Sequence, residues 1–345
     1  MIYIRADANK TIATGHIMRC LSIARQLVTM GEAVTFLVAD EESIPLLEEA
    51  GFPHVCLHSN WSQLEEELPV LLSFIQERNV KVLLVDSYFA SNAYLASLNQ
   101  VTKVVYFDDA DSYDHPVHTV IHYGIQYHKS KGQGIHTKDG VTYLTGCDYI
   151  PLREEFRNRA HVIKEEIKDI LITTGGTDPY NMAGHLIRVL LADGYTLHVI
   201  VGSLNNHVDC LRALANSEPT IKLYENVVRM SDIMTHCDVA ISAAGTTLYE
   251  LCAVGVPTIS FSFADNQIPG AKRLAELGII EYANDVREGR SVSLQAVKQI
   301  LTRYQDASYR LEQKKKMKEL VDGGGANRLA SYLYQLLQMK KEEDK

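Results

Sequence analysis

The sequence lacks the patterns that mark several common classes of protein. Its six cysteines are scattered and form no C-x-x-C pair, which argues against a zinc ribbon or a dithiol redox site. We interpret them as small buried hydrophobic residues in a reducing compartment. No apolar run approaches the roughly 20 residues that a membrane helix needs, and no signal segment opens the chain. These absences predict a soluble, cytoplasmic protein without stable membrane insertion.

Positive charge is also scarce. Lysine and arginine number 34 against 43 acidic residues, and the net charge is −9 at pH 7. A balance this acidic argues against a nucleic-acid-binding surface, so we expect no nucleic acid partner. The sequence also has no G-x-G-x-x-G, no P-loop and no H-E-x-x-H motif. Dinucleotide, nucleoside triphosphate and zinc-protease functions therefore lose support.

The order of predicted elements indicates an α/β protein with two domains. The chain has 345 residues, and short β-branched runs alternate with helical stretches, which implies right-handed βαβ units and parallel sheets. We place the first domain at residues 1–150 and the second at residues 165–345, with the charged segment 146–168 connecting them. Ligands bind at the carboxyl ends of such strands, so we expect loops of both domains to line a cleft.

Eleven strands and seven helices stand out in this pattern. The predicted strands are 2–7, 33–38, 54–57, 81–86, 103–107, 119–122, 169–173, 196–201, 220–223, 238–242 and 256–261. The predicted helices are 15–30, 61–78, 92–99, 181–191, 211–216, 246–254 and 271–277.

The most informative segment is the junction between the first strand and the first helix. Gly15 allows the backbone to approach a ligand closely, and His16 can transfer a proton near neutral pH. The helix N-terminus there suits a phosphate or a developing anion. Tyr88 follows another strand at its carboxyl end, so it can face the same cleft or be an ordinary loop aromatic.

Glycine-containing loops follow two strands of the second half. After the strand at 169–173 come two glycines and then Asp178, which suits the N-cap of a helix. After the strand at 238–242, small residues leave room for a bulky group beside the hydroxyls of Thr246 and Thr247. Glu250 lies one turn into the next helix, where a carboxylate can accept both hydroxyls of a ribose. Either loop can instead be a turn with a capped helix.

Three further patterns are weaker. Asp265 and Gln267 follow a strand and can hold sugar hydroxyls or cap a helix. Asp109 and Asp111 form a D-x-D pattern that could bind a divalent cation, but acidic turns are common. Five histidines lie close together at irregular spacing, and we predict no metal site from them. They are His115, His118, His122, His128 and His136.

Together these segments resemble the inverting UDP-sugar hydrolases of pseudaminic acid biosynthesis, which act on UDP-2,4-diacetamido-2,4,6-trideoxy-β-L-altropyranose. The same family includes spore-coat polysaccharide biosynthesis proteins, and it is related to the glycosyltransferase that builds peptidoglycan lipid II. The matching segments are 5–7, 14–20, 86–88, 146–149, 152–153, 175–179, 244–251, 264–267 and 322–326. The resemblance implies the GT-B fold, with two Rossmann-like domains whose parallel sheets face each other across a cleft.

The resemblance also implies roles for individual residues. His16 would be the catalytic base, and Tyr88 would assist it in the same pocket. The other residues implied to contact substrate are Gly15, Arg19, Gly176, Asn226 and Val228 (uracil), Gly245, Thr246, Thr247 and Leu248 (diphosphate), Glu250 (ribose), and Asp265 and Gln267 (sugar). No cofactor or metal is implied.

The chain departs from the family pattern at two places. Family members usually carry an asparagine-rich turn where this chain has His122-Tyr123-Gly124, a turn expected near the sugar. Ala13 stands where a glycine is frequent. The first departure concerns the identity of the sugar, and the second leaves the position of His16 intact.

We therefore expect a metal-independent hydrolase that releases UDP from a UDP-sugar with inversion, in contact with other enzymes of polysaccharide biosynthesis. A glycosyltransferase on the same scaffold would use an acceptor hydroxyl in place of water. A non-catalytic nucleotide-sugar-binding protein would keep the loops of the second half and lose His16 and Tyr88, which this chain retains.

Overall fold

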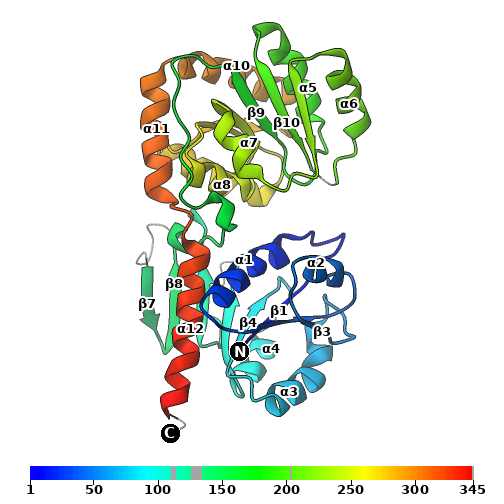
Figure 1. The fold of residues 1–345 in the computed structure, drawn as a ribbon, viewed down its shortest axis with the longest axis vertical. Helices are drawn as coiled ribbons and strands as arrows, with labels where there is room; N and C mark the ends of the chain where they lie inside the picture. The colour runs from blue at the N-terminus through cyan, green and yellow to red at the C-terminus, as the bar shows by residue number, and fades with distance from the viewer. Residues whose placement is uncertain (110–113, 126–133, 203, 344–345) are drawn as a thin grey trace. The chain divides into compact units, whose positions relative to one another are not determined.

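The computed structural model describes residues 1–109, 114–125, 134–202 and 204–343, and the chain divides into two compact units. Unit 1 comprises Met1–Arg153 and Gly324–Lys345, and unit 2 comprises Glu154–Gly323. Each unit has a largely parallel sheet with helices packed against it (Figure 1). No helix of the described residues is both long enough and apolar enough to span a bilayer.

The sheet of unit 1 has the strand order β3-β2-β1-β4-β5-β6-β8-β7. Its strands are β1 (Ile2–Ala6), β2 (Val34–Val38), β3 (His54–Cys56), β4 (Val82–Asp86), β5 (Lys103–Phe107), β6 (Thr119–His122), β7 (Gly134–Lys138) and β8 (Val141–Thr145). Adjacent strands are parallel, except that β7 is antiparallel to β8. The strand order reverses between β1 and β4. The carboxyl ends of strands at such a reversal are where open α/β sheets bind ligands.

Helices cover both faces of this sheet. They are α1 (Gly15–Thr29), α2 (Ile44–Glu49), α3 (Leu68–Glu77), α4 (Asn92–Asn99) and α12 (Gly325–Glu343). Successive side chains of a strand point to opposite faces, so β1 supplies Ile2 and Ile4 to one core and Tyr3 to the other. The first core also contains residues of α1 and α12, and the second contains residues of α3 and α4.

Unit 2 has a six-stranded sheet of order β11-β10-β9-β12-β13-β14, and its strand pairs are parallel. The strands are β9 (Asp169–Thr173), β10 (Thr196–Val201), β11 (Ile221–Glu225), β12 (Val239–Ala243), β13 (Thr258–Ser262) and β14 (Glu281–Asp285). The helices are α5 (Met182–Leu190), α6 (Val208–Ser217), α7 (Met230–His236), α8 (Thr247–Val254), α9 (Ile268–Glu276), α10 (Arg290–Tyr304) and α11 (Ala307–Leu320). Here the strand order reverses between β9 and β12.

The last helix corrects the predicted domain boundary. We expected the second domain to continue to residue 345, but α12 packs against α1 in unit 1. Leu329 and Leu333 of α12 are fully or almost fully buried in the core of that unit. Gly325 begins the helix where a Cβ would lie 2.1 Å from the carbonyl oxygen of Ile150. The chain therefore crosses between the units twice.

The predicted connection at 146–168 contains the first crossing, and its apolar residues pack in both units. Its first part packs in unit 1, where Cys147 and Tyr149 are buried. Its second part packs in unit 2, where Phe156 is fully buried and Ile167 joins the core. The charged residues of this segment are interspersed with apolar ones, and the apolar side chains hold it against both units.

Candidate functional site

The loops after β1 and β4, at the strand reversal of unit 1, bring His16 and Tyr88 together. His16 lies in the first turn of α1 and is 4% exposed. Its ring packs edge-on against Tyr88 at a centroid distance of 4.4 Å, while Tyr88 itself is 60% exposed. Neither ring nitrogen of His16 has a hydrogen-bond partner among the described residues. A buried imidazole with both nitrogens unused is suited to accept a proton from a ligand.

Asp86, the last residue of β4, is the carboxylate beside this imidazole. Its Oδ1 lies 4.0 Å from His16 Nδ1. Burial is the largest influence and favours the neutral acid, but the positive charge and hydrogen bonds of Arg19, together with smaller contributions from His16 and Cys20, outweigh it, so the pKa of Asp86 lies below its ordinary value. Asp86 is therefore a carboxylate near neutral pH, and it can stabilise a proton taken up by His16.

Arg19 clamps this carboxylate in place. Its Nε donates to Asp86 at 2.6 Å and its Nη2 donates to the other oxygen of the same group. The guanidinium also donates to Asp109 at 2.7 Å and to the hydroxyl of Tyr123 at 2.6 Å, and it lies over the ring of Phe107. Arg19 thus serves to position Asp86. Its contact with substrate stays a prediction.

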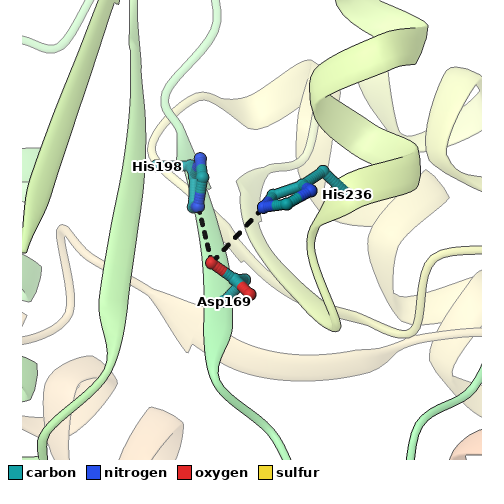
Figure 2. A group of neighbouring side chains, drawn as sticks. All are labelled: Asp169, His198 and His236. Atoms are coloured by element: carbon teal, nitrogen blue, oxygen red, sulfur yellow. Dashed lines mark hydrogen bonds and ion pairs between the residues drawn. The ribbon is translucent and has the colours of Figure 1, made fainter.

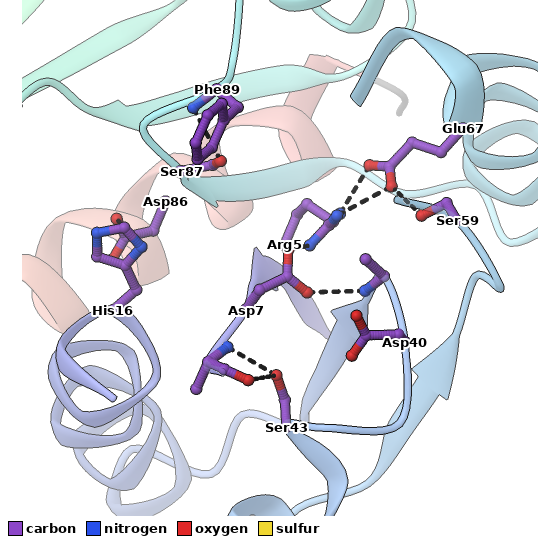
Figure 3. A network of polar contacts seen from close by, with 12 residues as sticks. Arg5, Asp7, His16, Asp40, Ser43, Ser59, Glu67, Asp86, Ser87 and Phe89 are labelled. Carbon is purple, nitrogen blue, oxygen red and sulfur yellow. Dashed lines mark hydrogen bonds and ion pairs between the residues drawn. The ribbon is translucent and has the colours of Figure 1, made fainter. Parts of the chain in front are cut away.

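A second buried network supports the end of β1 (Figure 3). Arg5 is fully buried, and both its Nε and Nη2 donate to Glu67, at 2.7 and 2.9 Å. Its Nη1 donates to Asp7, which in turn accepts the backbone N–H of Ala39. Tyr94 donates to Glu67 as well. These bonds fix the strand end from which the His16 loop departs. Glu67 was not predicted from the sequence, because no local pattern distinguishes it.

The predicted D-x-D pattern lies partly outside the described residues, which include Asp109 but not Asp111. Single ligand atoms of His16, Asp86 and Asp109 lie within 4.8 Å of one another. The guanidinium of Arg19 already binds both carboxylates, so a cation there would meet a positive charge. This arrangement favours a metal-free site.

The departure from the family pattern lies next to this clamp. Tyr123 accepts a hydrogen bond from Arg19 and packs beneath its guanidinium. His122 is fully buried, with Nε2 3.5 Å from Asp108, and His115 lies 3.0 Å from the same carboxylate. His128 lies outside the described residues. The changed turn therefore contributes Tyr123 to the base of the site.

In unit 2 the loop after β9 lies at the strand reversal, as the loop after β1 does in unit 1. Gly175 has a φ of +78°, a conformation that favours glycine. Gly202, at the end of β10, approaches this loop so closely that a Cβ there would lie 2.1 Å from the Gly175 carbonyl oxygen. A Cβ on Gly176 would meet no atom within 4 Å. Asp178 caps α5 by accepting the N–H groups of Met182 and Ala183, although it stands four residues before the helix.

The loop after β12 is the other loop at this reversal. Gly245 and Thr246 are exposed, and a Cβ on Gly245 would meet no atom within 4 Å. Leu248 is 3% exposed, and its N–H donates to the Gly245 carbonyl. A diphosphate at this loop would therefore be held by the exposed residues. Thr247 and Glu250 lie in the first turn of α8, where the half-buried Glu250 is the acidic residue.

The remaining predicted contacts lie on other loops of unit 2. Asn226 follows β11 with a φ of +51°, and Val228 is 83% exposed, an unusual position for an apolar side chain. Asp265 pairs with Arg287 at 2.7 Å, and Gln267 accepts the N–H of Phe263. The side chains of Asp265 and Gln267 thus have hydrogen-bond partners within unit 2. Arg287 was not predicted from the sequence, because it lies 22 residues from Asp265.

Comparison with known proteins agrees with this architecture. Residues 170–326 match the glycosyltransferase family 28 C-terminal domain. Over the whole chain, the MurG structure from Acinetobacter baumannii has a TM-score of 0.70 at 14% identity, covering 97% of this chain and 99% of that one. The expected GT-B fold is confirmed.

The chain is also similar in sequence to curated proteins of other organisms. The chain is 25% identical to the spore coat polysaccharide biosynthesis protein SpsG of Bacillus subtilis, over 98% of both chains. It is 24% identical to the UDP-2,4-diacetamido-2,4,6-trideoxy-beta-L-altropyranose hydrolase of Campylobacter jejuni, over 81% of this chain and 98% of that one. It also matches an uncharacterized protein of Methanocaldococcus jannaschii at 25% identity, where it spans about half of that protein's length (54%). The chain is thus a relative of nucleotide-sugar-processing enzymes of polysaccharide biosynthesis.

Proposed function

We propose that this protein hydrolyses a UDP-sugar to UDP and the free sugar, with inversion at the anomeric carbon. The observation that carries the proposal is the buried imidazole of His16, whose two nitrogens have no hydrogen-bond partner among the described residues. It lies beside the carboxylate of Asp86 and against the ring of Tyr88. Such a group is poised to act as a general base.

In this reaction a water molecule attacks the anomeric carbon while His16 takes its proton. The bond from that carbon to the diphosphate oxygen breaks, and the electron pair leaves with UDP. Asp86 stabilises the imidazolium that forms, because the carboxylate is held ionised by Arg19. Tyr88 closes one side of the imidazole.

We assign the nucleotide to the loops of unit 2. The exposed Gly245 and Thr246 and the half-buried Thr247 would hold the diphosphate at the start of α8, where the helix dipole favours negative charge. Glu250 would accept the ribose hydroxyls, and Asn226 with Val228 would hold the uracil. Gly15 and Gly176 leave space for substrate, because a Cβ on either would meet no protein atom within 4 Å.

One finding supports a second candidate, a glycosyltransferase that passes the sugar to an acceptor hydroxyl. Unit 2 carries the match to a glycosyltransferase C-terminal domain. The same base would then take the proton of the acceptor in place of that of water.

Incubation of the full chain with UDP- and CMP-sugars, with and without candidate acceptors, tests these proposals. We expect UDP release in water alone, an inverted anomer by NMR, and unchanged activity after EDTA treatment. Release that requires an acceptor would favour the transferase. Binding without turnover under every condition would contradict both. Loss of activity on EDTA treatment, restored by Mg²⁺ or Mn²⁺, would contradict the metal-free mechanism.

A further inference from the structure

A second cluster of side chains with metal-binding chemistry lies in unit 2, at the amino end of its sheet. Asp169 is the first residue of β9, His198 lies on β10, and His236 is the last residue of α7. The candidate nucleotide loops follow the opposite, carboxyl ends of strands in the same sheet. The proposed hydrolysis does not use this cluster.

The two imidazoles converge on one carboxylate oxygen (Figure 2). Nε2 of His198 lies 2.8 Å from Asp169 Oδ1, and Nε2 of His236 lies 3.7 Å from the same atom. The ligand atoms of all three residues lie within 4.8 Å of one another. Tetrahedral zinc with bonds of about 2.05 Å holds its ligands about 3.4 Å apart, so small side-chain shifts would accommodate one ion.

The surroundings of His198 favour this geometry. The ring is buried and stacks on Tyr224, whose hydroxyl lies 2.9 Å from Nδ1. A hydrogen bond at Nδ1 is the usual second interaction of a histidine that binds metal through Nε2, because it fixes the ring's orientation and tautomer. His236, in contrast, is 63% exposed and leaves the site accessible from solvent.

Lys164 is the cation already present near this carboxylate. Its Nζ lies 2.7 Å from Asp238 and 3.9 Å from Asp169 Oδ2. The lysine is thus closer to Asp238 and lies at the other oxygen of Asp169. Oδ1 remains directed at the two histidines. A proton can bridge Asp169 to one imidazole, whereas a divalent ion can bridge it to both.

We propose that Asp169, His198 and His236 bind a divalent transition metal ion such as Zn²⁺, with solvent in the open coordination position. Two imidazoles and a carboxylate are a ligand set that suits zinc. The ion joins β9, β10 and the end of α7, so it stabilises unit 2.

Titration of the chelator-stripped full chain with Co²⁺, followed by displacement with Zn²⁺, tests the proposal. We expect visible d–d absorption that saturates at one equivalent, and a higher unfolding temperature with Zn²⁺. The His236→Ala variant should lose both effects, and the exposed position of His236 preserves the core. Tyr224→Phe should weaken binding by about 10–100-fold, the usual effect of losing a partner of a metal-binding histidine.

His58→Asn is the matched control, because His58 is exposed in unit 1 and asparagine tolerates its φ of +53°. This variant should bind the metal as the unmodified chain does. Binding that survives His236→Ala would place the ion elsewhere and overturn the proposal, as would absence of the Co²⁺ absorption.

Discussion

At the scale of single residues, the neighbours of His16 divide between those that contact its ring and those that act through another group. Tyr88 packs on the ring and Asp86 lies 4.0 Å from its Nδ1. Arg19 acts through Asp86, because its guanidinium is occupied by Asp86, Asp109 and Tyr123. Loss of Arg19 would leave the buried carboxylate of Asp86 without its counter-ion, which would destabilise the fold.

Replacement of the proposed base tests the reaction. We expect His16→Ala to lower turnover about 10²–10⁴-fold, the usual contribution of a general base. UDP affinity should remain unchanged, because the assigned nucleotide contacts lie in unit 2. Steady-state kinetics and calorimetry with UDP measure the two quantities. Near-normal turnover would show that another group takes the proton, and His58→Asn serves as the control.

Glu250 tests the assignment of the ribose. Glu250→Ala should weaken UDP binding by about 1.5–3 kcal/mol, the range for hydrogen bonds to a charged group. The effect on 2′-deoxy-UDP should be much smaller, because that ligand lacks one hydroxyl partner. Calorimetric titration of both ligands against both proteins measures the difference. Equal losses would mean that Glu250 supports the helix and that the ribose is held elsewhere.

His161 makes the stability of unit 2 depend on pH. Burial lowers the pKa of this 1% exposed histidine from 6.5 to about 4. Between pH 4 and pH 6.5 His161 carries a proton in the unfolded chain but not in the folded one. Its contribution to the free energy of unfolding is therefore fully present above pH 6.5 and falls as the pH drops toward 4. We expect a loss of about 2 kcal/mol between pH 7 and pH 5 from this group.

Urea denaturation of the His161→Leu variant and of the unmodified chain at both pH values measures this effect. The variant should lose less stability on acidification than the unmodified chain. An identical pH dependence in the two proteins would contradict a buried neutral His161.

At the scale of secondary-structure elements, the sequence pattern predicted where helical residues occur but not where each helix begins. One helix was predicted over 61–78, but a 3₁₀ turn at Leu64–Glu67 precedes α3 (Leu68–Glu77). Pro69 stands in the first turn of α3. Proline suits the start of a helix, because the N–H that it lacks is required only in the helix interior. The turn also carries Glu67 to Arg5.

A substitution in α12 tests whether this helix stabilises unit 1. Leu329 is fully buried in the core of unit 1, although its helix follows unit 2 in the sequence. Leu329→Ala should destabilise unit 1 by about 2–5 kcal/mol through the lost burial and the cavity. Hydrogen exchange should show faster opening of β1 and α1 with unit 2 unaffected. Faster exchange confined to unit 2 would contradict the assignment of α12.

At the scale of the whole molecule, the division of labour between the units can be tested directly. Unit 2 has its own core and carries the assigned UDP contacts, so a fragment of residues 154–323 should bind UDP. It should show no hydrolysis, because His16 and Tyr88 belong to unit 1. Calorimetry and a UDP-release assay, each with the full chain beside it, measure both properties. A folded fragment that fails to bind UDP would contradict the assignment of the nucleotide to unit 2.

The α/β class and much of the strand pattern follow from the order of residues alone, because hydrophobic periodicity is a local property. Four predicted strands, including 103–107 and 169–173, have the observed bounds. The place of His16 in the first turn of α1 also followed from the junction of strand and helix. The GT-B fold was expected from motifs spread along the chain.

Contacts between residues far apart in the chain depend instead on the packing of the whole fold. Arg19 reaches Asp86 across 67 residues because β1 and β4 are neighbours in the sheet. His198 and Asp169 meet because β9 and β10 pair in parallel. The position of α12 depends on the apolar face that α1 presents to it. No local pattern encodes these contacts, since each depends on strand order and on surfaces formed by separate segments.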